Sequence, residues 1–174
     1  MFRIVLVAML LAVAGSAHAA AFKLTVDAAD DHGHIEKRHV YNGSGCDGAN
    51  HSPALRWENP PEGTSGYAVT VYDPDADGGW WHWVVLDIPV ITHHIDEDAT
   101  LPPGAFALKN SFGHPGWDGP CPPEGDAPHH YQFTVYALDT AALALTAETS
   151  PEEAKAAIKQ HALGKARATY TYGR

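Results

Sequence analysis

Four polar side chains stand where runs of alternating apolar residues begin or end: Asp73, His82, His129 and Tyr131. A carboxylate, two imidazoles and a phenol can donate hydrogen bonds, hold a proton and pair with charge. Each continues an otherwise apolar face, because side chains two residues apart in a strand point the same way. A lone polar group at a core margin is commonly just hydrogen-bonded, but the same pattern at three strand ends favours a shared site.

The segment before His129 consists largely of Gly and Pro, from Gly113 to Pro128. This composition excludes a helix or a central strand. Glycine lets backbone N–H groups approach a ligand, so we expect the loop at residues 116–119, with Gly119 and Pro120, to complete the site. Three tryptophans could form an apolar rim, Trp80, Trp81 and Trp117, although each of them taken alone is more often a core residue.

Such donors in apolar surroundings are typical of a pocket for a small anion, phosphate or carboxylate. We expect Asp73 to raise the pKa of the two histidines and so to favour a cationic pocket, and it could also face an ammonium group of the ligand. The alternative is a metal-dependent enzyme, because two His and one carboxylate are also a metal ligand set. No His-x-x-x-His or Cys-x-x-Cys spacing supports that alternative.

The elements that would position these groups are mostly strands. Apolar patterns predict strands at residues 22–26, 55–57, 67–73, 81–88, 129–137 and 167–172. In the fourth, His82 is expected to share a face with Val84, Leu86 and Ile88. Abundant turn residues between short strands predict a mostly β protein, an antiparallel β-sandwich with one or two peripheral helices.

A helix is predicted after Ser150, which suits the N-cap position and forms a capping box with Glu153. We expect it to include Ala162 and Leu163 and to stop at Gly164. Residues 140–147 suit a helical turn or short helix. Three histidines are expected in a solvated loop rather than a metal site: His32, His34 and His39.

The N-terminus has the pattern of an export signal. A charge at Arg3, an apolar run and Ala17-His18-Ala19 predict a signal peptide at residues 1–19 and a single domain at residues 20–174. An uncleaved anchor is the alternative, although the apolar run is short for a membrane span. We expect a periplasmic or secreted protein with no stable membrane insertion. The formal charge of −10 argues against nucleic acid.

The two cysteines, Cys46 and Cys121, predict a disulfide, because an even number of cysteines in an exported protein indicates pairing. Two free buried thiols are the alternative. A catalytic cysteine is disfavoured relative to both.

Several motifs together resemble the phosphatidylethanolamine-binding protein family, also called Raf kinase inhibitor protein-like. They are Tyr72-Asp73-Pro74-Asp75, Trp81-His82-Trp83, Gly119-Pro120-Cys121-Pro122-Pro123 and His129-His130-Tyr131. The run from Gly45 to Pro53 and the Tyr172-Gly173-Arg174 end look most like its bacterial YbhB/YbcL branch. The resemblance covers essentially all of residues 20–174 and implies a β-sandwich whose small pocket binds phosphate-type anions. It implies pocket roles for Asp73, His82, Pro120, His129 and Tyr131.

The chain departs from the family pattern at three positions. Asp77 stands where the family often has Pro, and Trp117 stands where a Tyr is usual. His130 replaces an Arg, which removes a fixed positive charge. The resulting acidic rim weakens the expectation of a strongly anionic partner.

These patterns favour an exported binding protein over an enzyme, with phosphate or a phosphoethanolamine-type headgroup as ligand and no cofactor. A hydrolase is disfavoured because there is no Gly-x-Ser-x-Gly elbow and neither Ser52 nor Ser111 has an identifiable base. The family names also suggest an inhibitor of a kinase or protease. A protein partner and a homodimer remain open alternatives.

Overall fold

The computed structural model describes residues 20–174, so the expected signal peptide and its cleavage site lie outside the described residues. The strands are β1 (Lys23–Asp27), β2 (Ala54–Glu58), β3 (Gly66–Asp73), β4 (Trp80–Pro89), β5 (His94–Ile95), β6 (Phe106–Ala107), β7 (His129–Leu138) and β8 (Ala162–Tyr172). A 3-10 turn, η1, spans Lys37–His39, and the helix α1 spans Pro151–His161. No helix among residues 20–174 is long and apolar enough to cross a membrane.

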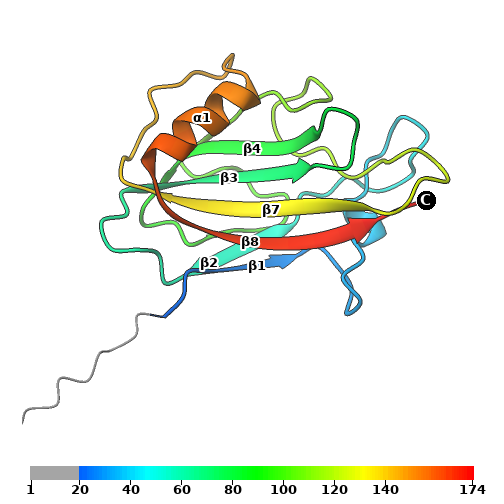
Figure 1. The fold of residues 1–174 in the computed structure, drawn as a ribbon, viewed down its shortest axis with the longest axis horizontal. Helices are drawn as coiled ribbons and strands as arrows, with labels where there is room; N and C mark the ends of the chain where they lie inside the picture. Colours follow the sequence, from blue (N-terminus) through cyan, green and yellow to red (C-terminus); the bar gives the residue numbers. More distant parts are fainter. Residues whose placement is uncertain (1–19) are drawn as a thin grey trace, which may run out of the picture.

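Two antiparallel sheets form the sandwich. The larger has the strand order β6-β4-β3-β7-β8, and the smaller has the order β1-β2-β5. Figure 1 shows β4, β3, β7 and β8 side by side, with α1 and the β1–β2 pair on opposite sides of them. One core lies between the sheets, and a second lies between the larger sheet and α1. The mostly β sandwich expected from the sequence is confirmed.

Strands β3 and β7 keep the predicted alternation. Tyr67, Val69 and Val71 of β3 face the core between the sheets, as do Tyr131 and Phe133 of β7. Their pairing runs without a register shift from Gly66 opposite Leu138 to Tyr72 opposite Gln132. A period of two therefore carries the apolar face through to the polar residues at the strand ends.

Strand β4 does not keep the predicted face. Its pairing with β3 shifts register twice, opposite residues 67–69 and 71–72. As a result Ile88 faces the core between the sheets, whereas Val84 and Leu86 face α1. The expectation that all three share a face with His82 is wrong, because each bulge reverses the alternation of the side chains that follow it.

The helix begins as predicted and ends earlier. The Ser150 side chain accepts from the Glu153 N–H, and the Glu153 side chain accepts from the Ser150 N–H. The helix stops at His161, and residues 162–164 already belong to β8. Gly164 pairs with Ala137 inside that strand, where pairing with β7 provides the backbone hydrogen bonds that a further helical turn would have made. Residues 140–147 form no helix.

Of the three histidines expected in a solvated loop, His32 and His34 are exposed and His39 is buried. The His39 Nδ1 lies 2.8 Å from the carbonyl oxygen of His51, to which it donates. The expectation for His39 is wrong because a segment distant in sequence folds over η1 and supplies this acceptor.

Candidate functional site

A cavity of about 890 Å³ opens where β3 ends and where β4 and β7 begin. It contains all four of the polar side chains singled out by the strand patterns. Its lining consists of Ser44, Asp73, Asp75, Ala76, Asp77, Trp80, His82, Ser111, Phe112, Cys121, Pro122, Pro123, Asp126, His129 and Tyr131. The antiparallel pairing of β3 with β4 and β7 explains the gathering, because it places the end of one strand beside the start of its neighbours.

Asp73 is buried and both of its carboxylate oxygens accept hydrogen bonds. Oδ1 accepts from the backbone N–H of Asp75 at 2.8 Å and of Ala76 at 3.3 Å. Oδ2 lies 2.7 Å from Nδ1 of His129, which donates to it. Asp73 therefore fixes the turn after β3 and the orientation of the His129 ring. Its contact with an ammonium group of a ligand stays a prediction.

His82 is 2% exposed, and its Nδ1 lies 2.6 Å from the carbonyl oxygen of Asp118. Burial lowers the pKa of His82, and this effect outweighs the opposing effects of the Asp118 carbonyl and of the Asp73 charge. Asp73 does act in the direction expected from the sequence. The expectation that Asp73 raises the pKa of His82 above its ordinary value is therefore wrong, because desolvation is the larger cause and leaves this ring neutral near pH 7.

Tyr131 is 1% exposed, and burial raises the pKa of its phenol. The hydroxyl therefore stays protonated and can donate. It makes no hydrogen bond within residues 20–174, although the side chain lines the cavity. The Tyr131 ring packs edge-on against His82, with centroids 5.1 Å apart.

A buried polar network behind His82 escaped the sequence patterns. The Asp118 carboxylate accepts from Nδ2 of Asn110 at 2.8 Å, from Nδ2 of Asn50 at 3.2 Å and from Nδ1 of His114 at 3.0 Å. The Asp118 backbone N–H also donates to the His82 carbonyl. These bonds hold in place the carbonyl that His82 contacts. No strand pattern could reveal them, since Asp118 and Asn110 lie in irregular loops.

Gly119 and Pro120 support the site without lining the cavity. The Gly119 N–H donates to Oδ1 of Asn50 at 2.8 Å, so it is not free for a ligand. A Cβ at Gly119 would lie 1.9 Å from the His39 carbonyl oxygen, which explains the glycine. The Pro120 carbonyl accepts from the Tyr41 N–H. Their direct ligand contacts, expected from the sequence, stay a prediction.

Of the three tryptophans expected at the rim, Trp80 lines the cavity and packs edge-on against Phe112. Trp81 lies on the opposite face of the sheet, where its Nε1 donates to Glu152 at 2.6 Å. Trp117 packs against the core between the sheets. Trp80 alone therefore lines the cavity, whereas Trp81 and Trp117 pack in the cores, which was the alternative for each tryptophan. Trp80 and Trp81 differ because neighbouring residues of β4 face opposite sides of the sheet.

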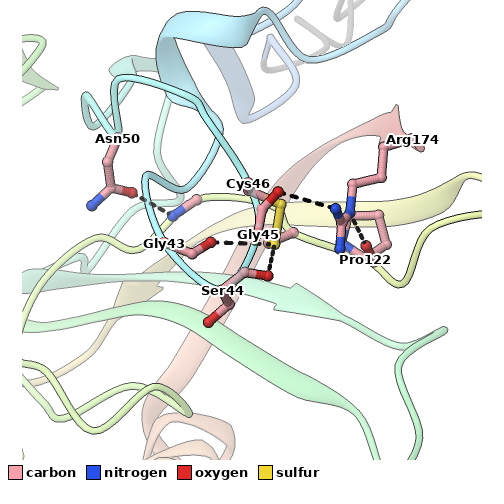
Figure 2. Close-up of a disulfide and its surroundings, with 9 residues drawn as sticks. Gly43, Ser44, Gly45, Cys46, Asn50, Pro122 and Arg174 are labelled. Atoms are coloured by element: carbon pink, nitrogen blue, oxygen red, sulfur yellow. Dashed lines mark hydrogen bonds between the residues drawn. A yellow bond between two sulfur atoms is a disulfide. The ribbon is translucent and has the colours of Figure 1, made fainter.

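The predicted disulfide between Cys46 and Cys121 is present, and Cys121 lines the cavity. It joins two loops that form one wall. Arg174 joins the same loops a second time: its Nε donates to the Pro122 carbonyl at 2.7 Å and its Nη1 to the Gly45 carbonyl at 3.1 Å (Figure 2). This wall is thus fixed covalently and by hydrogen bonds.

The charged side chains that line the cavity are acidic. Four carboxylates line the cavity, from Asp73, Asp75, Asp77 and Asp126, and no Lys or Arg of the described chain does. His130 contacts Asp75 through its ring and its backbone N–H instead of entering the cavity. Within residues 20–174, no three His, Cys, Asp or Glu side chains are arranged to hold a metal ion.

Comparison with known proteins agrees with this architecture. The family model described as phosphatidylethanolamine-binding protein matches residues 25–173. The chain is 46% identical to the UPF0098 protein YbcL of Escherichia coli over 143 residues, 78% of each chain. It is 41% identical to the putative lipoprotein LppC of Mycobacterium tuberculosis over 128 residues, which cover 73% of this chain and 62% of that protein.

The fold matches solved structures as well. The crystal structure of E. coli YbcL, described as a new member of the mammalian PEBP family, superimposes with a TM-score of 0.85 at 39% identity, covering 89% of this chain and 99% of YbcL. The homologue CT736 from Chlamydia trachomatis gives a TM-score of 0.75 at 30% identity, covering 88% and 98%. By sequence and by fold, this chain belongs to the phosphatidylethanolamine-binding protein family.

Proposed function

We propose that this chain is an exported binding protein whose cavity takes phosphate or a phosphorylated headgroup. One observation carries the proposal. His82 is 2% exposed and Tyr131 is 1% exposed, both line the cavity, and neither the His82 Nε2 nor the Tyr131 hydroxyl makes a hydrogen bond within residues 20–174. Polar atoms that buried side chains present to a cavity are suited to hydrogen-bond a polar ligand.

The chemistry of the neighbouring groups suits a phosphoryl group. Tyr131 donates through its hydroxyl, and His129 has a second ring nitrogen beyond the one that Asp73 holds. Trp80 and Phe112 give the lining an apolar part, and a low local dielectric strengthens each hydrogen bond made inside. Two exposed acidic residues of the lining, Asp77 and Asp126, suit an amine on the same ligand, as in phosphoethanolamine.

Export is supported by the disulfide, which persists in oxidising compartments, and by the lipoprotein named among the relatives. The metal-dependent enzyme has no support of this kind, since no cluster of metal ligands is found among the described residues. A protein partner that responds to occupancy of the cavity would be consistent with this role.

Calorimetric titration with phosphoethanolamine tests the proposal. We expect His129→Ala to weaken binding by about tenfold or more, because one lost hydrogen bond to a charged group is worth about 1.5–3 kcal/mol. His94→Ala is the matched control, since His94 is exposed in β5 and does not line the cavity. Equal affinities in wild type and His129→Ala, with both folded, would show that the cavity is not the binding site.

A further inference from the structure

The hydrogen bond of His82 fixes which of its nitrogens carries the proton. A carbonyl oxygen only accepts, so the 2.6 Å contact with Asp118 places the proton on Nδ1. In a neutral ring the other nitrogen, Nε2, then has a lone pair and no hydrogen. Within residues 20–174, Nε2 makes no hydrogen bond, and His82 lines the cavity. The cavity thus presents an acceptor at this point.

The hydrogen bonds around Asp118 prevent the His82 ring from rotating by half a turn. The Asp118 backbone N–H donates to the His82 carbonyl at 3.2 Å, which ties the two residues together. Asp118 is 4% exposed, and its carboxylate accepts hydrogen bonds from the side-chain amides of Asn50 and Asn110. If the ring turned over, a carbon would face the carbonyl and a buried hydrogen bond would be lost.

The charges in the lining disfavour a second negative charge on the ligand. Asp73, Asp75, Asp77 and Asp126 all face the cavity, and no Lys or Arg among the described residues does. Two of these, Asp75 and Asp77, lie in the turn directly after Asp73. A ligand that keeps one proton on its anionic group carries less charge and also supplies a donor.

We propose that His82 selects, through its acceptor Nε2, anions that still carry an acidic hydroxyl, and so makes the cavity a site for phosphomonoesters and against phosphodiesters and sulfate esters. The inference rests on the proposed function, because it concerns the same cavity. A phosphomonoester has a second ionisation near pH 6, so it presents a P–OH group in mildly acidic solution. A phosphodiester and a sulfate ester have no second ionisation and leave Nε2 without a donor.

Each group in the cavity then has a complementary role. The P–OH of the ligand donates to His82 Nε2, and Tyr131 donates to another phosphoryl oxygen. Buried acceptors discriminate strongly in this way, because the wrong ligand leaves a desolvated lone pair unpaired. The volume of about 890 Å³ accommodates all three ligand classes, so size does not predict the same order of affinity.

Three ligands with the same ethanolamine group isolate the effect of the proton: phosphoethanolamine, glycerophosphoethanolamine and ethanolamine O-sulfate. Titration calorimetry at pH 6 should show phosphoethanolamine binding at least about tenfold more tightly than either of the others. Its affinity should fall as pH rises above about 6, where the P–OH group ionises. Ethanolamine O-sulfate is the decisive arm, since it is as small as phosphoethanolamine. Equal affinity for the sulfate and the phosphate would overturn the selectivity while leaving the binding role intact.

Substitution of His82 tests whether this residue causes the selectivity. His82→Phe keeps a ring and removes both nitrogens, so the ratio of phosphate to sulfate affinity should fall to about one. His94→Phe, at an exposed position away from the cavity, should keep the wild-type ratio. A ratio unchanged in His82→Phe would overturn the assignment.

A measurement on wild-type protein keeps the inference testable if His82→Phe fails to fold. Nitrogen-15 NMR spectra at pH 7 without ligand should show that Nδ1 of His82 carries a proton and that Nε2 does not. The opposite tautomer would refute the inference. If none of the three ligands binds and the tautomer is as expected, the proposed function fails instead.

Discussion

The Nδ1 atom of His129 lies 2.7 Å from Oδ2 of Asp73, and the two side chains join the start of β7 to the end of β3. Both side chains are buried and line the cavity. The pair therefore does two things: it links neighbouring strands where their backbone pairing ends, and it fixes the orientation of the His129 ring in the lining of the cavity.

Asp73→Asn should weaken phosphoethanolamine binding by about tenfold or more, because an amide holds the His129 ring less firmly than a charge-assisted bond does. Asp31→Asn is the matched control, since Asp31 is exposed, does not line the cavity and makes no side-chain hydrogen bond within residues 20–174. It should leave His129 in place, and removal of one negative charge should not weaken binding of inorganic phosphate. Titration calorimetry with both ligands measures these effects, and equal losses in the two variants would contradict the role of the Asp73–His129 pair.

Removal of the disulfide should lower the free energy of unfolding by about 4 kcal/mol on the loop-entropy account. The Cys46→Ala/Cys121→Ala double variant opens a loop with a sequence separation of 75. Urea titration under identical conditions gives the difference. Ligand affinity should fall as well, because the disulfide holds one wall of the cavity. A variant with wild-type affinity would show that the Arg174 hydrogen bonds hold this wall alone.

Stability should depend on pH through His82. Its pKa in the folded protein is below the ordinary value of 6.5, so the unfolded chain binds the proton more readily. The contribution of His82 to the stability of the folded protein is fully present above about pH 6.5 and is lost as pH falls below this value. The folding equilibrium constant then decreases by up to tenfold per pH unit.

The charged groups that face this ring are Asp73 and Asp118, and both raise its pKa against the larger effect of burial. Urea titrations from pH 8 to pH 5 should therefore show a smaller decline for His82→Phe than for wild type. His94→Phe should decline as wild type does. Parallel curves for wild type and His82→Phe would show that the buried ring takes up a proton without cost.

Export predicts a defined N-terminus. The mature protein in the periplasmic or secreted fraction should begin near Ala20, as the small residues Ala17 and Ala19 predict. Intact-mass measurement checks this directly. A product from that fraction that retains Met1 would contradict cleavage.

The sequence alone determined the features that depend on short-range pattern. Alternation placed Asp73 and Tyr131 on the inward faces of β3 and β7, because no bulge interrupts the pairing of these two strands. The capping box located the start of α1, since its hydrogen bonds join residues only three apart. The disulfide followed from the even number of cysteines and from the oxidising compartment that the export signal predicts.

Only the tertiary structure decided the properties of His82. Two register shifts set which residues of β4 face each core, and Asp118, 36 residues further along the chain, supplies the acceptor for its ring. The end of α1 and the burial of His39 likewise depend on distant segments, β7 and the His51 carbonyl. Desolvation and hydrogen-bond partners arise from contacts between such segments, so the protonation state of a buried histidine cannot be obtained from the residues beside it in the sequence.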